Sequence, residues 1–154
     1  MNKKNLRKGF TTVELVIVIA VIAILATALI PTFGGLINSA NETAAMNEAR
    51  TIYNDLLLEY TESMANADCY IEVDGWYYAV NDGKLSTDGT DKEPSVGFIV
   101  TKSAANATEA TDPTAAPYVT KEYTCSIKGN LAKTTDTTGT IYVHPFTGDA
   151  WKAS

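Results

Sequence analysis

The chain has 154 residues and a mass of 16.5 kDa, which is enough for one domain and an extension. Residues 1–8 carry four of the twelve basic residues, whereas the chain from Phe10 onward has 8 basic and 18 acidic residues and therefore a net charge of −10. This acidic balance argues against direct binding of nucleic acid, which needs clustered Lys and Arg, and one His with two Cys is too few for a zinc site made by this chain alone.

The first predicted element is an apolar helix. Residues 15–30 are apolar except for Thr27, and no charged residue occurs between Glu14 and Glu42. The 21 residues from Phe10 to Ile30 would form about 31 Å of helix at ~1.5 Å per residue. This length matches a hydrocarbon core of roughly 30 Å, so the sequence predicts a membrane-spanning segment.

The charges before this segment predict its orientation. The four cations Lys3, Lys4, Arg7 and Lys8 precede it, and no acidic residue lies among them. The positive-inside rule therefore keeps the first eight residues in the cytoplasm and places the chain after Pro31 outside.

A secretory signal peptide is the alternative interpretation of the same segment. The basic start, the apolar run and Ala26-Thr27-Ala28 as a small-residue cleavage site fit it. Glu14 argues against it, because a carboxylate at the head of an apolar run is costly unless it is paired. The helical pattern also continues well beyond the cleavage site. The second hypothesis is therefore a Sec-secreted or membrane-anchored extracellular binding module.

The start of the chain carries a specific motif. Gly9-Phe10-Thr11-Thr12-Val13-Glu14, followed by the apolar run and Pro31, resembles the N-terminus of type IV prepilins and pseudopilins. The common pattern in that family is Gly-Phe-Thr-Leu-x-Glu, from which this chain departs only by Thr12. The resemblance is strong over residues 3–31 and looser along the helix that follows.

This resemblance implies a processing site and an assembly site. A membrane prepilin peptidase would cut between Gly9 and Phe10 and methylate the new amine of Phe10. In a filament, the carboxylate of Glu14 would face the Phe10 amine of a neighbouring subunit. Pairing would offset the desolvation penalty that each charge carries in an apolar bundle, and it would set the register between helices that could otherwise slide.

A helical period continues after Pro31. Apolar residues recur there at steps of three and four, while Asn, Asp and Glu take the other face, which predicts an amphipathic helix that needs a partner surface. We expect one helix from about residue 11 to about residue 65. Pro31, with Gly34-Gly35 one turn later, should kink or loosen it.

The period then changes to two, which predicts strands. Cys69–Val73, Asp74-Gly75 and Trp76–Val80 form the pattern of a hairpin with a two-residue type I′ turn. Residues 101–117 hold no large apolar residue and predict an exposed loop. The other predicted strands lie at residues 95–100, 118–127 and 140–144.

These elements predict an α+β fold similar to that of a type IV pilin: a long N-terminal helix, kinked near Pro31, packed on a small antiparallel β-sheet of three to five strands. We divide the chain into four parts. They are a prepilin leader peptide at residues 1–9, a transmembrane or filament-core helix at 10–30, the amphipathic second half of the helix at 31–66, and a globular β-rich region at 67–154.

The remaining candidate residues carry weaker signals. Cys69 and Cys125 would lie in an exported domain, so they form either a disulfide, which is slightly favoured, or two buried thiols. His144 fits a structural or exposed side chain better than a catalytic one. The acidic cluster from Asp82 to Glu93 lacks EF-hand spacing, so we expect no metal and no cofactor.

We therefore expect a structural protein without enzymatic activity, a subunit of a type IV pilus or pseudopilus-like filament. The resemblance implies a prepilin peptidase, identical or related pilin subunits and, indirectly, an assembly platform and its ATPase as partners. It also implies a single-pass precursor in the cytoplasmic membrane, with the N-terminus inside, and a filament at the cell surface after assembly. The chain itself has no G-x-x-x-x-G-K-[ST] motif for binding ATP.

Overall fold

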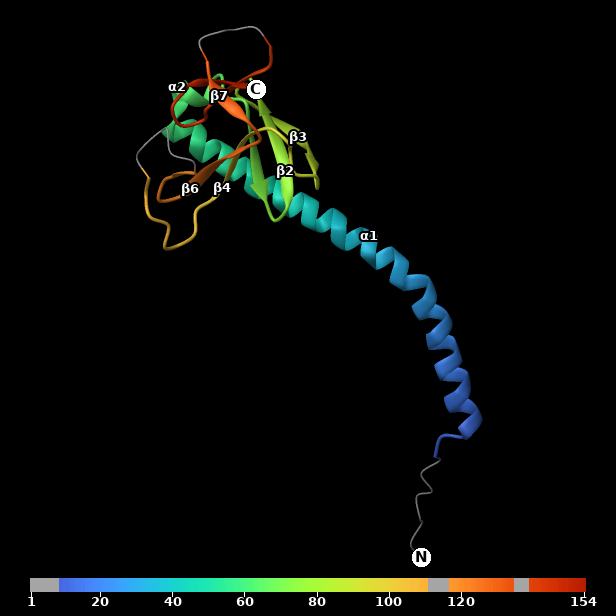
Figure 1. The fold of residues 1–154 in the computed structure, drawn as a ribbon. Coiled ribbons are helices and arrows are strands. Elements are labelled where there is room, and N and C mark those ends of the chain that lie inside the picture. The colour runs from blue at the N-terminus through green and yellow to red at the C-terminus, as the bar shows by residue number, and fades with distance from the viewer. Residues whose placement is uncertain (1–8, 111–116, 135–138) are drawn as a thin grey trace, which may run out of the picture. The chain divides into compact units, whose positions relative to one another are not determined.

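A computed structural model describes residues 9–110, 117–134 and 139–154 (Figure 1). The chain divides into two compact units, Met1–Ala40 and Asn41–Ser154, and we call the second unit the head. Helix α1, Thr12–Glu59, begins in the first unit and ends in the head. The predicted α+β class is confirmed, because the head packs the end of α1 against β-sheet.

Helix α1 follows the predicted helix for most of its length. It runs through Pro31 without an interruption of its helical structure, so the kink at this residue stays a prediction. At Tyr60 the backbone leaves the helical region, with φ −120° and ψ 46°, and a last turn follows as α2, Thr61–Met64. The prediction of one helix to about residue 65 is correct apart from this break.

The rest of the head carries the strands. In chain order they are β1 Cys69–Val73, β2 Trp76–Asn81, β3 Lys84–Thr90, β4 Gly97–Lys102, β5 Tyr118–Val119, β6 Tyr123–Lys128, β7 Leu131–Lys133, β8 Ile141–Val143 and β9 Ala150–Ala153. Within the described residues they form a six-stranded sheet in the order β3-β2-β1-β4-β6-β5 and a three-stranded sheet in the order β7-β9-β8.

The hairpin predicted between Cys69 and Val80 is confirmed. Strands β1 and β2 pair antiparallel up to Val73 and Trp76, which leaves Asp74-Gly75 as the two-residue turn. Both turn residues have positive φ angles, 50° and 82°, as a type I′ turn requires. An Asp-Gly pair between two apolar strands therefore fixed this register locally.

The prediction of one antiparallel sheet with three to five strands is wrong. Strands β1 and β4 run parallel, with Cys69 opposite Phe98, so the large sheet is mixed, and it has six strands beside a second sheet of three. A parallel pair needs a long crossover, which β2, β3 and the following loop supply. Strands β3, β7 and β9 were not predicted, because they are short or polar and their order comes from pairing with neighbours.

The core of the head lies between α1 and the six-stranded sheet (Figure 1). The buried residues of α1 lie on one helix face and are Ala45, Ala49, Ile52 and Leu56. They join one cluster with buried side chains of β1, β2 and β4, which include Ile71, Tyr78, Val80, Phe98 and Val100. The two alanines leave room for the helix backbone to approach the sheet closely.

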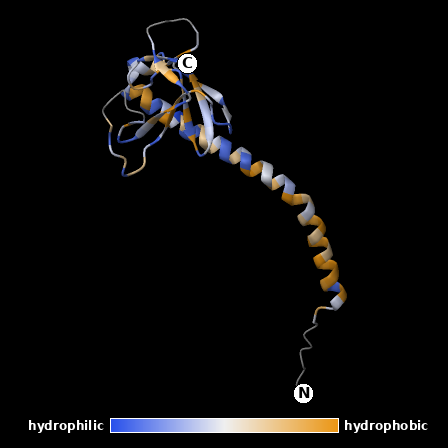
Figure 2. Cartoon of the chain, in the orientation of Figure 1, coloured by the Kyte–Doolittle hydropathy of each residue, from blue (hydrophilic) through white to orange (hydrophobic). Residues whose placement is uncertain are grey.

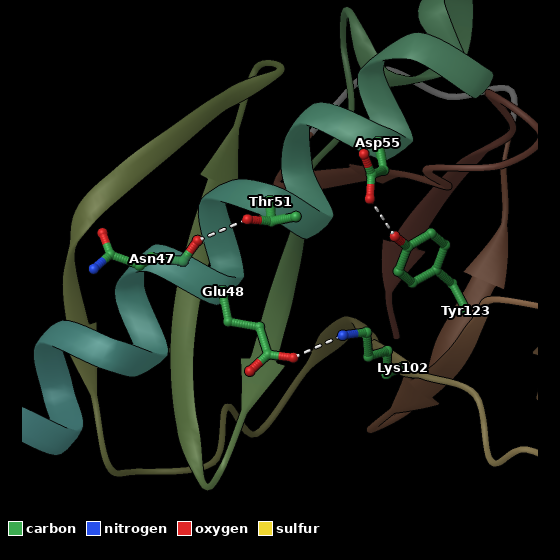
Figure 3. A network of polar contacts seen from close by, with 6 residues as sticks. All are labelled: Asn47, Glu48, Thr51, Asp55, Lys102 and Tyr123. Carbon is green, nitrogen blue, oxygen red and sulfur yellow. Dashed lines mark hydrogen bonds and ion pairs between the residues drawn. The ribbon is translucent and has the colours of Figure 1, made fainter.

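Polar contacts fix α1 on the sheet (Figure 3). Toward β4 and β6, Lys102 Nζ donates to Glu48 Oε1 at 2.9 Å, and the hydroxyl of Tyr123 donates to Asp55 Oδ2 at 2.9 Å. Toward β3, the hydroxyl of Tyr53 donates to the carbonyl of Gly83 at 2.7 Å. The helix is therefore bonded to strands on either side of its axis, and these bonds fix its rotation about that axis in the head.

The turn between β2 and β3 requires glycine at position 83. Gly83 has a φ of +67°, and a Cβ at this position would collide with the backbone carbonyl groups of Met64 and Ala65. Its N–H donates to the carbonyl of Ala67 at 2.9 Å. The end of α2 and this turn therefore pack backbone against backbone, which holds the start of β3 next to α1.

Candidate functional site

The predicted processing site lies in the exposed segment before α1. Gly9 and Phe10 precede the helix, and 84% of Phe10 is exposed. A Cβ at Gly9 would meet nothing within 4 Å in the described chain. Both residues that flank the predicted cut are therefore exposed in the described chain. The remainder of the predicted leader, residues 1–8, lies outside the described residues.

Glu14 lies in the first turn of α1 and forms a capping box with Thr11. The backbone N–H and the hydroxyl of Thr11 donate to Glu14 Oε2 at 2.9 and 2.7 Å, and the N–H of Glu14 donates to Thr11 Oγ1 at 3.3 Å. Such reciprocal bonds satisfy N–H groups that a helix start leaves free, and an N-cap contributes about 1 kcal/mol. The Thr-x-x-Glu spacing is a sequence signal for this box that the prediction for Glu14 did not use.

The surface of α1 from Leu15 to Ile30 is apolar on every side, and the hydropathy colouring shows this part of the helix as hydrophobic (Figure 2). Fifteen large hydrophobic side chains from Val13 to Ile37 are between 49% and 70% exposed. Among the described residues, α1 is the one helix whose length and composition would let it cross a membrane. Among the described residues of the first unit, 9–40, nothing covers this surface.

Two threonines within this apolar stretch bond their hydroxyls to the helix itself. Thr27 Oγ1 donates to the carbonyl of Ile24 at 2.8 Å, and Thr32 Oγ1 donates to the carbonyl of Leu29 at 2.8 Å. A hydroxyl bonded inside its own helix needs no water in an apolar surrounding. The threonines therefore interrupt the sequence pattern but leave the segment fit for lipid or for packing against like helices.

The two predicted cysteines are buried free thiols. Cys69 pairs with Phe98 on one side of β4, and Cys125 pairs with Val100 on its other side. With strands about 4.8 Å apart, the cysteines lie about 10 Å from each other across β4, beyond the ~7 Å that Cα atoms of a disulfide can span. The slightly favoured disulfide is therefore not formed, and the alternative of two thiols describes the structure.

Burial also makes these thiols poor nucleophiles. It raises the pKa of Cys69 to about 12, with the nearby charge of Asp68 adding to the effect, and it raises the pKa of Cys125 well above its ordinary value. Because the thiolate is the reactive form, both side chains act as small hydrophobic residues of the core.

His144 is buried among aromatic side chains. Only 2% of it is exposed, and its ring centroid lies 4.8 Å from that of Phe98 and 5.8 Å from that of Tyr118. Its Nδ1 accepts a hydrogen bond from the N–H of Phe146 at 3.1 Å. Burial lowers the pKa of His144 to about 4, so the ring is neutral at pH 7 and serves the core.

The acidic cluster from Asp82 to Glu93 does not converge. Glu93 forms an ion pair with Lys128 at 2.8 Å, while Asp82 lies in the β2–β3 turn with its N–H bonded to Asp68 Oδ1 at 2.8 Å. In the part of the chain that the structure describes, no group of three or more His, Cys, Asp or Glu side chains could hold a metal ion.

Comparisons with known proteins identify the family. Residues 4–30 match the family described as the prokaryotic N-terminal methylation motif. A type IV major fimbrial protein FimA of Dichelobacter nodosus is 33% identical over 120 residues, which cover 70% of this chain and 73% of that protein. The chain belongs to the type IV pilin family.

A second type IV major fimbrial protein FimA of Dichelobacter nodosus is 34% identical to this pilin over 117 residues, which cover 70% of the pilin and 69% of that protein. Both matches cover far more of the chain than the N-terminal motif, so the likeness includes part of the head. No solved structure gave a significant match to this pilin.

Proposed function

We propose that this pilin is made as a membrane-anchored prepilin, trimmed at its N-terminus and polymerised through the first part of α1 into a type IV pilus or pseudopilus-like filament. The family match and the fimbrial relatives support a structural subunit of a pilus. The observation that carries the assembly role is the exposed apolar surface of α1 from Val13 to Ile37. The proposal assigns the chain no catalytic step.

Water is an unsuitable solvent for this surface. Removing apolar area from water stabilises by about 25 cal/mol per Å², and fifteen large side chains contribute such area. In the precursor the bilayer would solvate them, and in the filament the same helices of neighbouring subunits would do so. Lipid tails and leucine-like side chains are similarly apolar, so transfer between the two surroundings changes the free energy little. Reversible assembly is then physically reasonable.

Trimming would create the counter-ion for Glu14. Cleavage between Gly9 and Phe10 frees an amine, and N-methylation of Phe10 leaves it positively charged. The capping box uses only Oε2 of Glu14, and Oε1 has no hydrogen-bond partner among the described residues. A neighbouring subunit's amine could therefore pair with Oε1 while Thr11 keeps its bonds to Oε2. This arrangement would preserve the helix start and offset the desolvation of both charges.

The proposed organisation follows the predicted parts. Residues 1–9 form the leader, 10–30 the membrane and filament-core segment, 31–66 the second half of the helix, and 67–154 the β-rich region. The precursor would cross the cytoplasmic membrane once with its N-terminus inside, and the assembled filament would lie at the cell surface. Its partners would be the prepilin peptidase, other pilin subunits and, indirectly, an assembly platform with its ATPase.

The N-terminus of the native protein tests the processing step. Intact-mass analysis and N-terminal sequencing should find a chain that starts at N-methyl-Phe10. A chain that starts at Leu29 would instead indicate a signal peptide cut after Ala28, and an uncut chain would indicate a permanent membrane anchor. Either of these two results would overturn the proposed function.

Replacing Glu14 tests the assembly step. We expect Glu14→Ala to be made and trimmed normally but to give roughly tenfold fewer filaments sheared from cells, which corresponds to the loss of about 1.4 kcal/mol per subunit contact. Glu42→Ala is the matched control, because Glu42 is an exposed acid of the same helix outside the apolar segment. Equal filament yields for both variants would contradict the pairing role of Glu14.

A further inference from the structure

A shallow groove runs along the head between α1 and β3. Its walls come from two stretches of chain that the fold brings together, the helix from residue 46 to residue 54 and the start of β3. The residues that line it are Met46, Arg50, Tyr53, Asn54, Lys84, Leu85 and Thr87. The groove lies at the edge of the six-stranded sheet, because β3 is the outermost strand on that side.

The apolar side chains that line the groove are held in place by the core of the head. Met46, Tyr53 and Leu85 are partly buried and pack against the core of the head. The hydroxyl of Tyr53 donates to the carbonyl of Gly83 at 2.7 Å, which ties the helix wall to the start of the strand wall. Leu85 is opposite Val80 in the sheet. The two walls are therefore held at a fixed separation.

The two cations of the groove have no carboxylate partner within the described residues. The head carries 17 acidic and 8 basic residues, and Arg50 and Lys84 are two of these eight. Three other lysines, Lys102, Lys128 and Lys133, each pair with a carboxylate at 2.7 to 2.9 Å. Within the described residues, neither Arg50 nor Lys84 forms an ion pair or a side-chain hydrogen bond, and both are exposed.

The cations on the two sides of α1 differ in their surroundings. On the side of α1 that faces β4, Glu48 neutralises Lys102 (Figure 3). On the side that faces β3, Arg50 of the helix and Lys84 of the strand line one groove with no acidic residue among its walls. Positive charge therefore lies beside partly buried apolar side chains in this groove, although the head as a whole is strongly acidic.

We propose that this groove binds exposed carboxylates on the head of a second copy of this chain and so forms a contact between subunits. The proposal rests on the proposed function, because a filament brings many copies together. Heads with a net charge of −9 repel each other, so close packing needs positive charge where they meet. A free polyanion and a second head are both repelled by the rest of the head, but the proposed filament holds second heads close to this groove, and each of them supplies carboxylates in excess.

The groove would set how heads pack more than how strongly they bind. Charges at the rim of an interface mainly guide encounter and register, and solvent screens part of their attraction. The apolar floor of Met46 and Leu85 would add contact area under the charges. Salt should therefore weaken the attraction at the groove while it also screens the general repulsion between heads.

Zero-length carbodiimide cross-linking of intact filaments tests the contact, because it joins a lysine to a carboxylate only where the two touch. Filaments assembled from a mixture of ¹⁴N- and ¹⁵N-labelled subunits would distinguish links between copies from links within one copy. We expect mixed-isotope links from Lys84 to an acidic residue of the head. Their absence, or links from Lys84 to a different macromolecule, would overturn the inference. Filaments with no such link would still support the proposed function.

A charge-reversed variant gives a second readout. We expect Arg50→Glu/Lys84→Glu to lower filament yield by roughly tenfold relative to Lys92→Glu/Lys121→Glu. The second variant is the matched control, because it changes the net charge of the head equally, and Lys92 and Lys121 are exposed cations that do not line the groove. Thermal unfolding of both variants checks that the head is intact. If the folded groove variant assembles as well as the control, the groove makes no subunit contact.

Discussion

The two stretches of α1, one in each unit, differ in whether their apolar side chains are exposed or buried. From Leu15 to Ile37, α1 carries apolar side chains on every side, and the large ones are at least 49% exposed. From Asn41 to Glu59 it is apolar along a single stripe, whose members are at most 2% exposed against the sheet. Among the described residues of the first unit, nothing covers the apolar side chains of the first stretch. The sheet of the head covers the apolar stripe of the second stretch.

The comparison also shows where register comes from. In the head, Glu48, Tyr53 and Asp55 bond to residues of the sheet or its turns, so only one rotation of the helix satisfies them. The apolar stretch has no such contact, and an evenly apolar surface favours no rotation or offset against a neighbour. Glu14 is the one ionisable group available to select one in the proposed assembly.

Removing the first stretch should give the largest effect. We expect a chain that starts at Asn41 to remain in the aqueous fraction, while the full chain partitions into membranes or detergent. Because no side chain from Gly9 to Ala40 is buried, the deletion leaves the core intact. Both Trp and all eight Tyr residues lie in the head, so its near-UV circular dichroism and its unfolding midpoint should match those of the full chain in detergent. An unfolded or aggregated fragment would show that the head depends on the first stretch.

The second prediction breaks the stripe inside the head. Leu56 is fully buried, and Leu56→Ala should lower the free energy of unfolding by about 2–5 kcal/mol, because it removes buried carbon atoms and leaves a cavity. Leu58 lies two residues further along α1 and is 82% exposed, so Leu58→Ala should change the free energy by about 0.5 kcal/mol or less. Urea unfolding measures both, and similar losses would contradict the assignment of the stripe.

Local sequence signals were enough for much of this organisation. The apolar run and the Gly-Phe-Thr motif predicted the candidate assembly segment, because composition and short spacing carry that information. The change of period near residue 68 and the Asp74-Gly75 pair predicted the end of the helix and the first hairpin, because turn chemistry is local. The Thr11–Glu14 box has an equally local signal.

The rest depends on contacts between distant residues. Strand β3 holds one large apolar residue, Leu85, and its order comes from pairing with β2. The parallel pairing of β1 with β4 is a choice between two directions that the alternation of side chains does not distinguish. The placement of Arg50 and Lys84 in one groove follows from the same long-range packing, so no spacing in the sequence indicates it.

The smallest of the three effects comes from His144. Its titration should make the stability of the head depend on pH, whereas membrane partition of the apolar stretch should not. Its ring lies in the head among Phe98, Tyr118 and Phe146, where a charged imidazolium would lose its water. Burial is the main cause that lowers the pKa of His144 from 6.5 to about 4; Asp149 opposes this shift and Lys133 adds to it. The unfolded chain therefore binds a proton at a higher pH than the folded head does.

The stability that His144 contributes is complete above pH 6.5 and is lost as the pH falls toward 4. Between pH 7 and pH 5 we expect the wild-type head to lose about 2 kcal/mol more of its free energy of unfolding than His144→Asn, in which no imidazole can be protonated. Urea unfolding across this range measures the difference, and groups such as Asp68 titrate equally in both proteins. Equal pH dependence would mean that the folded head accepts the imidazolium. Because residues 15–40, which include the apolar stretch, hold no ionisable side chain, partition of the full chain into membranes should change far less over the same range.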